Sequence, residues 1–97
     1  MLFVSATIKA KPDSVALVRS ELFKFIAPTL QEDGCHQYLL HQSIEDPATF
    51  IFYEEWIDQA ALDAHLESDH IKKGIAAMDG HLEDVTVTTM LRVESEK

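Results

Sequence analysis

Large apolar residues follow one another over residues 50–57, interrupted only by two adjacent glutamates, and this pattern predicts a buried strand. Side chains alternate between the two faces of a strand. Both faces bear large apolar groups, so we expect protein to cover both, and each carries one carboxylate into poorly hydrated surroundings. One face holds Phe50, Phe52, Glu54 and Trp56, and the other holds Ile51, Tyr53, Glu55 and Ile57.

Alternation along the chain predicts three further strands, over residues 2–11, 37–44 and 85–92. Apolar residues at helical spacing predict a long helix over residues 14–31, in which Pro28 should kink the last turns and after which Gly34 is a suitable stop. The second and third strands are joined by the turn 45–48, so we expect them to form an antiparallel hairpin.

Two short helices are predicted between the third strand and the fourth. Asp58 is a suitable N-cap for the first, and Ser68 or Asp69 for the second. The inward positions of the first are Ala61, Leu62, His65 and Leu66, and those of the second are Ile71, Ile75 and Met78.

The resulting order, β-α-β-β-α-β, predicts an α+β fold of the ferredoxin-like split arrangement, with an antiparallel sheet and helices on one face. We expect a single domain over residues 1–97, with a polar tail from about residue 94. Because the third strand is apolar on both faces, we expect a second subunit to cover the other face of the sheet, which makes the protein a homodimer.

Net charge and cysteine content limit the classes of partner and the cellular compartment that we expect for the protein. The chain has 17 acidic and 8 basic residues, a formal net charge of -9, which argues against nucleic acid and against anionic membranes. The single cysteine, Cys35, cannot form an internal disulfide and suits a reducing cytoplasm. The N-terminus reads as neither a signal peptide nor a membrane span.

The central strand and the helix after it carry a recognisable combination of residues. Phe50-Ile51-Phe52-Tyr53-Glu54-Glu55-Trp56 is followed by Ala61-Leu62, His65 and Ser68-Asp69-His70, and upstream lie Gly34-Cys35, Tyr38, His41-Gln42-Ser43 and Asp46-Pro47. This combination closely resembles the antibiotic biosynthesis monooxygenase family, which includes the quinol monooxygenases, over nearly the whole chain.

The resemblance implies a dimeric α+β barrel, in which two subunits pack sheet against sheet and each holds a pocket between its helices and its sheet. Some members oxidise quinols or polycyclic phenols with oxygen and use no metal or flavin, and others degrade haem. The haem-degrading members pair the strand tryptophan with an asparagine and a histidine, whereas Thr7 and Ile75 stand at the corresponding places here. Haem degradation by that arrangement is therefore disfavoured.

His65 and Glu54 are the candidate catalytic residues. His65 lies on the apolar stripe of its helix, and a buried neutral imidazole could act as a general base or could instead tie the helix to the sheet. A desolvated Glu54 could exchange protons with a phenolic substrate, or could form a salt bridge with Arg19, Arg92 or a partner subunit.

Aromatic residues of the strands are the candidate substrate-binding groups. Phe50, Phe52 and Trp56 form a stripe that could line a pocket for a flat aromatic substrate or could simply be core. Tyr53 could help shape and dry the pocket. Of Tyr38 and His41, which lie on opposite faces of their strand, only one can enter a given pocket.

The spacing of the histidines predicts no metal site, and only a site assembled from distant strands stays open. His65 and His70 are five residues apart, which would turn them to different sides of one helix, and His36 and His81 read as solvated. Cys35 reads as a small buried thiol. Glycine-rich phosphate loops, nucleophile motifs and the Rossmann fingerprint are absent from the sequence.

Three functions therefore stay open. The first is a cofactor-independent monooxygenase acting on a small quinol or phenol. The second is a non-oxidative isomerase or lyase on a small, phosphorylated or carboxylated metabolite, which would need basic groups in the pocket. The third is a non-catalytic binding or structural dimer. The basic groups available to the second are Lys9, Lys11, Lys72, Lys73 and Arg92.

Overall fold

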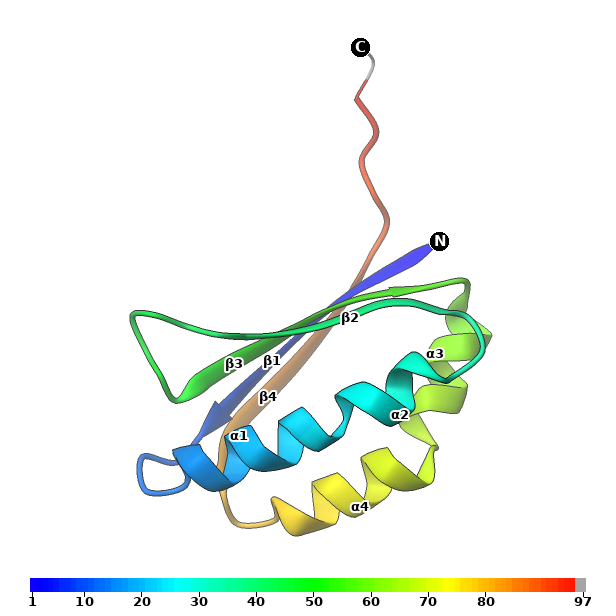
Figure 1. The fold of residues 1–97 in the computed structure, drawn as a ribbon. Helices are drawn as coiled ribbons and strands as arrows, with labels where there is room; N and C mark the ends of the chain where they lie inside the picture. The colour runs from blue at the N-terminus through cyan, green and yellow to red at the C-terminus, as the bar shows by residue number, and fades with distance from the viewer. Residues whose placement is uncertain (96–97) are drawn as a thin grey trace.

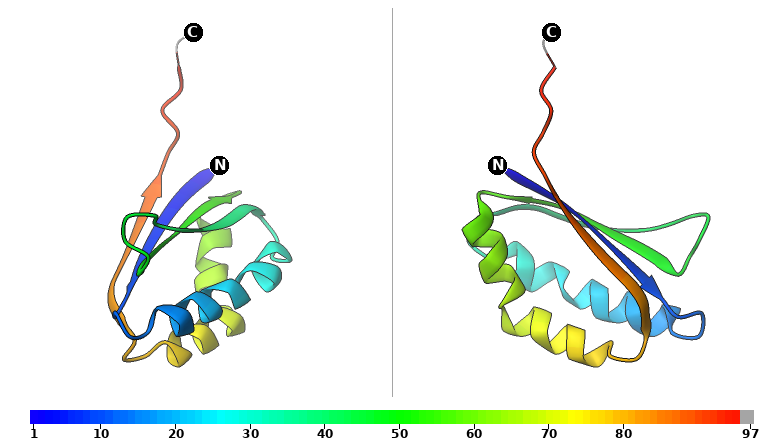
Figure 2. Two further views of the ribbon diagram at one scale, coloured as in Figure 1. Left: turned by 60° about the vertical axis from the view of Figure 1, so that its left-hand side comes forward. Right: turned by 180° about the vertical axis from the view of Figure 1, so that it is seen from behind.

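A four-stranded antiparallel sheet with helices on one face makes up the protein (Figure 1). The computed structural model describes residues 1–95. The strands are β1 (Leu2–Ala10), β2 (Cys35–Gln42), β3 (Thr49–Trp56) and β4 (Leu82–Met90), and the helices are α1 (Val15–Lys24), α2 (Ile26–Leu30), α3 (Gln59–Leu66) and α4 (Asp69–Ala77). The views in Figure 2 show the four helices on the same side of the sheet. The predicted α+β, ferredoxin-like fold is confirmed.

The strand order is β2-β3-β1-β4, with β1 and β3 in the centre. Ala6 of β1 lies opposite Phe52 of β3 and opposite Val87 of β4, so these three side chains share a face. The alternation predicted for the central strand is confirmed, because the even-numbered residues of β3 are buried against the helices and the odd-numbered ones are only half-buried on the uncovered face.

The predicted helix over residues 14–31 is two helices, because the chain breaks at Phe25. Pro28 gives the physical reason. It has no N–H to donate to the carbonyl of Lys24, and its ring crowds that carbonyl, so α1 ends there. Leu30, at the end of α2, is 48% exposed.

Two strands start earlier than their alternation predicted. Cys35 already lies opposite Trp56, and a register irregularity follows it before Gln37. Leu82 lies opposite Ala10, again beside an irregularity. Backbone hydrogen bonds set both starts, so side-chain alternation did not reveal them. Of the predicted polar tail, residues 96–97 lie outside the described part, and residues 91–95 form no helix or strand.

Close packing of α1 against α4 depends on a glycine. Gly74 faces the ring of Phe25, and a Cβ atom at this position would clash with that ring. The N-cap predicted at Asp58 is confirmed, because its Oδ1 accepts a hydrogen bond of 2.9 Å from the amide of Ala61. Ser68 stands at the N-cap of α4, but its hydroxyl donates to the carbonyl of His65 at 2.5 Å instead.

The helices leave the β4 edge of the sheet open. Val85 and Val87 face the helix side but are 51% and 53% exposed. Leu66 and Ile75, predicted to be inward positions, are 47% and 58% exposed on the helices opposite. Within residues 1–95, no helix is long and apolar enough to cross a membrane.

Candidate functional site

A cleft lies between the helices and the sheet, and it opens at the β4 edge. Its volume is about 150 Å³. Leu66, Ile75, Val85 and Val87 form its mouth, and the rest of its lining is aliphatic and aromatic except for Tyr38, Glu54 and His65. No lysine or arginine of residues 1–95 lines it.

Glu54 is 4% exposed and has one polar partner, the indole of Trp56. The indole N–H of Trp56 donates to Glu54 Oε1 at 2.8 Å. Burial raises the pKa of Glu54 from 4.5 to about 7, an effect that the indole hydrogen bond partly offsets. No salt bridge from Arg19 or Arg92 to Glu54 is present among the described residues. The carboxyl group can therefore change its protonation near neutral pH.

His65 is 3% exposed and is held by Glu32, a residue of the loop between α2 and β2. Its Nδ1 lies 2.7 Å from Glu32 Oε2. A carboxylate only accepts, so Nδ1 carries the proton and the neutral ring keeps a lone pair on Nε2. Burial lowers the pKa of His65, although the hydrogen bond with Glu32 acts in the opposite direction.

Glu54 and His65 each keep one polar atom free for a ligand. No described residue forms a hydrogen bond with Glu54 Oε2 or with His65 Nε2. Every fully buried side-chain nitrogen and oxygen among the described residues does have a partner. These two atoms must therefore be accessible, and both residues line the cleft. The cleft thus offers two hydrogen-bond acceptors against an apolar wall.

Aromatic rings hold these groups in place. The His65 ring lies 4.7 Å from the Trp56 ring and 5.3 Å from the Tyr38 ring, centroid to centroid. Tyr38 stacks on Phe52 at 4.5 Å. Burial raises the pKa of the Tyr38 phenol, and the nearby charge of Glu54 raises it further, so this phenol stays protonated.

The structure brings together only part of the predicted substrate-binding set. Phe52 and Tyr38 line the cleft together with Glu54 and His65. Trp56 and Phe50 are 0% and 1% exposed and do not line it. Trp56 lies behind the wall, where it positions Glu54 and His65. The aromatic stripe is therefore mainly core, the plainer of its two interpretations.

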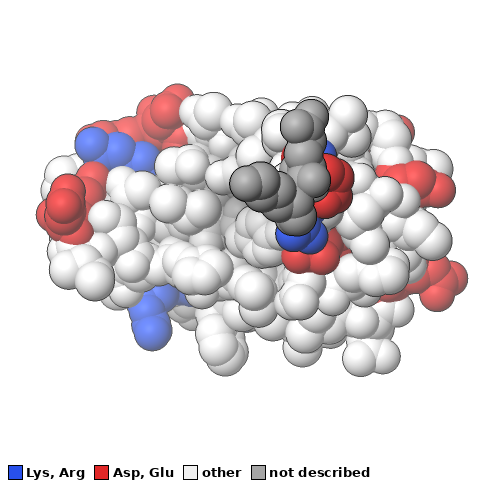
Figure 3. Space-filling model, turned by 90° about the horizontal axis from the view of Figure 1, so that it is seen from above, with Lys and Arg blue, Asp and Glu red and all other residues white. Residues whose placement is uncertain are grey.

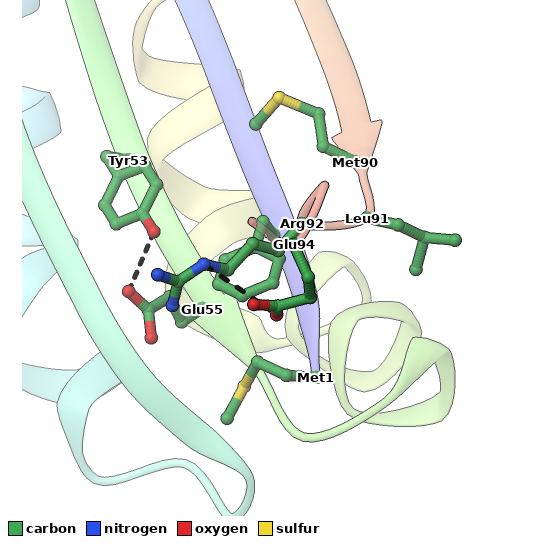
Figure 4. A pocket seen from close by; sticks show the side chains of 8 residues that line it. Met1, Tyr53, Glu55, Met90, Leu91, Arg92 and Glu94 are labelled. Carbon is green, nitrogen blue, oxygen red and sulfur yellow. Dashed lines mark hydrogen bonds and ion pairs between the residues drawn. The ribbon is translucent and has the colours of Figure 1, made fainter. Parts of the chain in front are cut away.

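Tyr53 and His41 lie on the other face of the sheet and are separated from the cleft. Tyr53 donates its hydroxyl hydrogen to Glu55 Oε2 at 2.8 Å, and His41 Nδ1 lies 3.2 Å from the carbonyl oxygen of Ile51. A hollow of about 840 Å³ on this face is lined by residues that include Tyr53, Glu55 and Arg92. Figure 4 shows the hydrogen bond between Tyr53 and Glu55 within it. This hollow is larger than the cleft, but it is open and lies on the uncovered face.

Glu32, His65 and His70 form a cluster that the spacing of the histidines did not predict. Their ligand atoms all lie within 4.8 Å of one another, so the cluster could hold a metal ion. The spacing argument placed both histidines on one helix, but His65 ends α3 and His70 begins α4. The turn between the helices brings the two rings within 6.0 Å. Glu32 lies in a loop, and nothing in its local sequence marked it.

The sequence is similar to those of known proteins. The sequence profile described as "Antibiotic biosynthesis monooxygenase" matches residues 1–83. "Putative monooxygenase YcnE" of Bacillus subtilis is 32% identical over 78% of the chain and 80% of its own length. "Probable quinol monooxygenase YgiN" of Escherichia coli is 29% identical over 90% of the chain and 93% of its own length.

Similarity extends to solved structures. The crystal structure of PA3566 from Pseudomonas aeruginosa superposes with a TM-score of 0.92 and 33% identity, covering 96% of this chain and 94% of that one. The chain spans only about half, 47%, of the uncharacterised protein sll1783 of Synechocystis, with which it shares 32% identity.

Proposed function

The chain belongs to the antibiotic biosynthesis monooxygenase family, and from this membership we propose that it is a monooxygenase that oxidises a small quinol or phenol with dioxygen in the cleft. The observation that carries the proposal is the pairing of two free acceptor atoms, Glu54 Oε2 and His65 Nε2, with an otherwise apolar wall. The name of the relative YgiN, "Probable quinol monooxygenase", supports the substrate class.

The size and polarity of the cleft support a single uncharged ring as the reacting group. Its volume of about 150 Å³ equals that of an engineered apolar cavity that binds benzene, so one ring fits and a larger substrate must extend through the mouth. The hydroxyl groups of a quinol would pair with the two acceptors, and its ring would lie against Phe52 and Tyr38.

We assign the proton transfer to Glu54. A base is most effective when its pKa is near the working pH, and burial brings Glu54 to about 7. The ionised carboxylate takes a hydroxyl proton, and the resulting anion is more reducing than the neutral quinol. His65 Nε2 accepts a hydrogen bond from the other hydroxyl and so orients the ring.

The overall reaction balances without another reductant. The quinol anion gives one electron to dioxygen, and the two radicals join through a new bond between carbon and oxygen. The peroxide takes back the proton held by Glu54, and the O–O bond then breaks together with the C–H bond at the same ring carbon. One oxygen stays on that carbon as a carbonyl, and the other leaves as water with the ring hydrogen and the returned proton. One quinol and one dioxygen thus give one hydroxylated quinone and one water. The substrate supplies the electrons, which is why the proposal needs no flavin or metal.

The isomerase or lyase alternative gains no support from the cleft. A phosphorylated or carboxylated substrate needs a cationic partner, and no lysine or arginine of the described residues lines the cleft. The third possibility, a non-catalytic binding dimer, makes no such demand on the lining and is decided by turnover.

We further propose that the protein works as a homodimer through the uncovered face of the sheet. Figure 3 shows that uncharged side chains cover most of this face, with charged ones mainly toward its ends and around the C-terminal segment. Its apolar members, including Phe3, Leu39 and Ile51, are only partly covered within one chain. Face-to-face packing of two sheets would bury them. Sedimentation equilibrium tests this, and a monomer at micromolar concentration would contradict it.

The test of function is oxygen consumption by chelator-treated protein with a panel of reduced benzoquinones, naphthoquinones and simple phenols. We expect saturable oxygen uptake with at least one single-ring or two-ring quinol, and a hydroxylated quinone as product. A quinol phosphate should neither react nor compete, because the cleft has no cation to bind it. If no member of the panel is consumed above the uncatalysed rate, the proposal is wrong.

A further inference from the structure

The cluster of Glu32, His65 and His70 lies next to the cleft, and of its three members only His65 contacts the substrate in the proposed reaction. It draws on three separate elements, the α2–β2 loop, the last turn of α3 and the first turn of α4. The side chains are 18%, 4% and 22% exposed, in that order. His70 does not line the cleft, so the cluster has a side of its own toward solvent.

The distances in the cluster suit a metal ion. Glu32 Oε2 lies 2.7 Å from His65 Nδ1 and 3.2 Å from His70 Nε2. With metal–ligand bonds of about 2.0–2.2 Å, neighbouring ligand atoms of a tetrahedral or octahedral site lie roughly 3.0–3.5 Å apart. A small outward shift of His65 from Glu32 would admit an ion between the three atoms.

The donor set points to a transition metal. Two imidazoles and one carboxylate suit zinc, iron, cobalt or nickel better than magnesium or calcium, which prefer oxygen ligands. Two hydroxyl oxygens lie close by, Thr29 Oγ1 at 3.0 Å and Ser68 Oγ at 3.5 Å from His70 Nε2. They could hydrogen-bond to water on the remaining positions of the ion.

The charge of the cluster is not balanced by a basic side chain. Within residues 1–95, Glu32 forms ion pairs with the two imidazoles, and no lysine or arginine pairs with it. The whole chain has a formal net charge of -9, which raises the local concentration of cations. A divalent ion would therefore meet favourable electrostatics at this position.

We propose that Glu32 Oε2, His65 Nδ1 and His70 Nε2 bind one divalent transition-metal ion of the zinc type, and that the bound ion inhibits oxidation in the cleft. The second half rests on the proposed function. A neutral imidazole carries one proton. When a metal occupies Nδ1, that proton lies on Nε2, which then donates a hydrogen bond and can no longer accept one from the substrate.

Metal binding is tested without any assay of turnover. Untagged, chelator-treated full-length protein is titrated with Co²⁺, and the visible absorption of the bound ion is recorded. Zn²⁺ is then added to displace it, and its binding is followed by calorimetry. We expect one equivalent of Co²⁺ to produce saturable absorption bands that one equivalent of Zn²⁺ removes. The absence of such bands, or binding of several weak equivalents, would overturn the site.

Two variants locate the site. His70→Ala removes a ligand outside the cleft. It should weaken Co²⁺ binding at least about 10- to 100-fold, because this is the typical loss when only a residue that supports a metal ligand is removed. His36→Ala, at an exposed histidine of β2, is the matched control and should bind as the unmodified protein does. Equal binding by both variants would overturn the assignment. Should His70→Ala not fold, as judged by circular dichroism, Glu32→Gln serves instead.

Inhibition is tested separately, so that the two proposals can fail independently. Stoichiometric Zn²⁺ should abolish quinol-dependent oxygen uptake in the unmodified protein and in His36→Ala, but not in His70→Ala. Saturable Co²⁺ binding in a protein that oxidises no quinol would leave the site standing and remove the proposed function. Turnover that continues with Zn²⁺ bound would overturn the inhibitory role.

Discussion

The two faces of β3 place neighbouring carboxylates in opposite surroundings. Glu54 points under the helices, is 4% exposed, and meets only the indole N–H of Trp56, so burial raises its pKa to about 7. Glu55 points to the uncovered face, where the Tyr53 hydroxyl donates to it. Two consecutive residues of one strand are thus a candidate base on one face and a surface acid on the other.

Two tyrosines on the opposite faces of the sheet both have a raised pKa, but for different reasons. The pKa of Tyr38 is raised chiefly by burial under the helices, and that of Tyr53 chiefly by the hydrogen bond that its hydroxyl gives to Glu55. The direction is the same, but only the first cause reports a dry environment. A perturbed pKa therefore indicates a site only when its cause is known.

The largest expected effect is on turnover. Glu54→Gln keeps the volume and can still accept the hydrogen bond from Trp56, but it cannot take a proton. We expect the rate of quinol oxidation to fall about 10²- to 10⁴-fold, the contribution of a general base. Glu55→Gln, one residue away on the other face, should change it less than about twofold. Oxygen uptake measures both, and equal losses in the two variants would contradict the assignment.

The next effect compares packing on the two faces. Phe52 is 2% exposed in the core, and Phe52→Ala should lower the free energy of unfolding by about 3–5 kcal/mol. Leu39, on the uncovered face of β2, is 45% exposed, so Leu39→Ala should cost about 1 kcal/mol or less in a monomer. Urea unfolding at several protein concentrations measures both. The proposed homodimer would bury that face, so under conditions where it forms the loss for Leu39→Ala should be larger and should depend on protein concentration, whereas a small loss at every concentration would contradict the dimer.

A smaller effect is expected on the pH dependence of the free energy of unfolding, which the buried Glu54 should cause. The folded pKa of Glu54, about 7, lies above its ordinary value of 4.5, so the folded state binds more protons between these values and loses stability as pH rises through them. Glu54→Gln removes this loss. We expect the variant and the unmodified protein to be equally stable near pH 4 and the variant to be more stable at pH 8, by up to about 3 kcal/mol.

Turnover should follow the opposite course over the same pH range. Because the ionised carboxylate is the base, the rate of oxidation should rise with pH around an apparent pKa near 7. Chemical unfolding and oxygen uptake from pH 4 to pH 8 measure the two trends. A stability difference between the variant and the unmodified protein that does not vary with pH would show that Glu54 is not desolvated.

Alternation and helical spacing predicted the helix-facing side of the site because they fix where side chains point. Glu54 and Phe52 followed from the period of a strand, and His65 followed from the stripe of its helix. The same patterns could not distinguish the residues that line the cleft from those that are buried in the core. Phe50 and Trp56 share the face of Glu54, but other side chains separate them from the cleft.

The remaining parts of the site depend on tertiary contacts that a local pattern does not contain. Glu32 reaches His65 from 33 positions away along the chain. His70 approaches His65 because the α3–α4 turn reverses the direction of the chain, which a single-helix spacing rule excludes. The mouth residues Leu66 and Ile75 fit an apolar stripe, but periodicity does not say whether a neighbouring element covers that stripe.

The smallest expected effect compares the two phenols directly. Tyr38 is 3% exposed, and its hydroxyl forms a hydrogen bond with Thr29, which is fully buried. Tyr38→Phe would leave the Thr29 hydroxyl with one partner fewer in a dry environment, and we expect a loss of about 1 kcal/mol in the free energy of unfolding.

Tyr53→Phe removes the donor to Glu55 on the uncovered face, where water can replace it in the monomer, so at a protein concentration too low for the proposed homodimer we expect no measurable change in the midpoint of urea unfolding. Both variants keep the ring, so the hydroxyl alone is tested. If Tyr53→Phe destabilised the protein as much as Tyr38→Phe does, water could not be reaching the Tyr53 hydroxyl. The uncovered face would then be buried in solution, and the contrast between the two faces would belong to a single chain but not to the assembled protein.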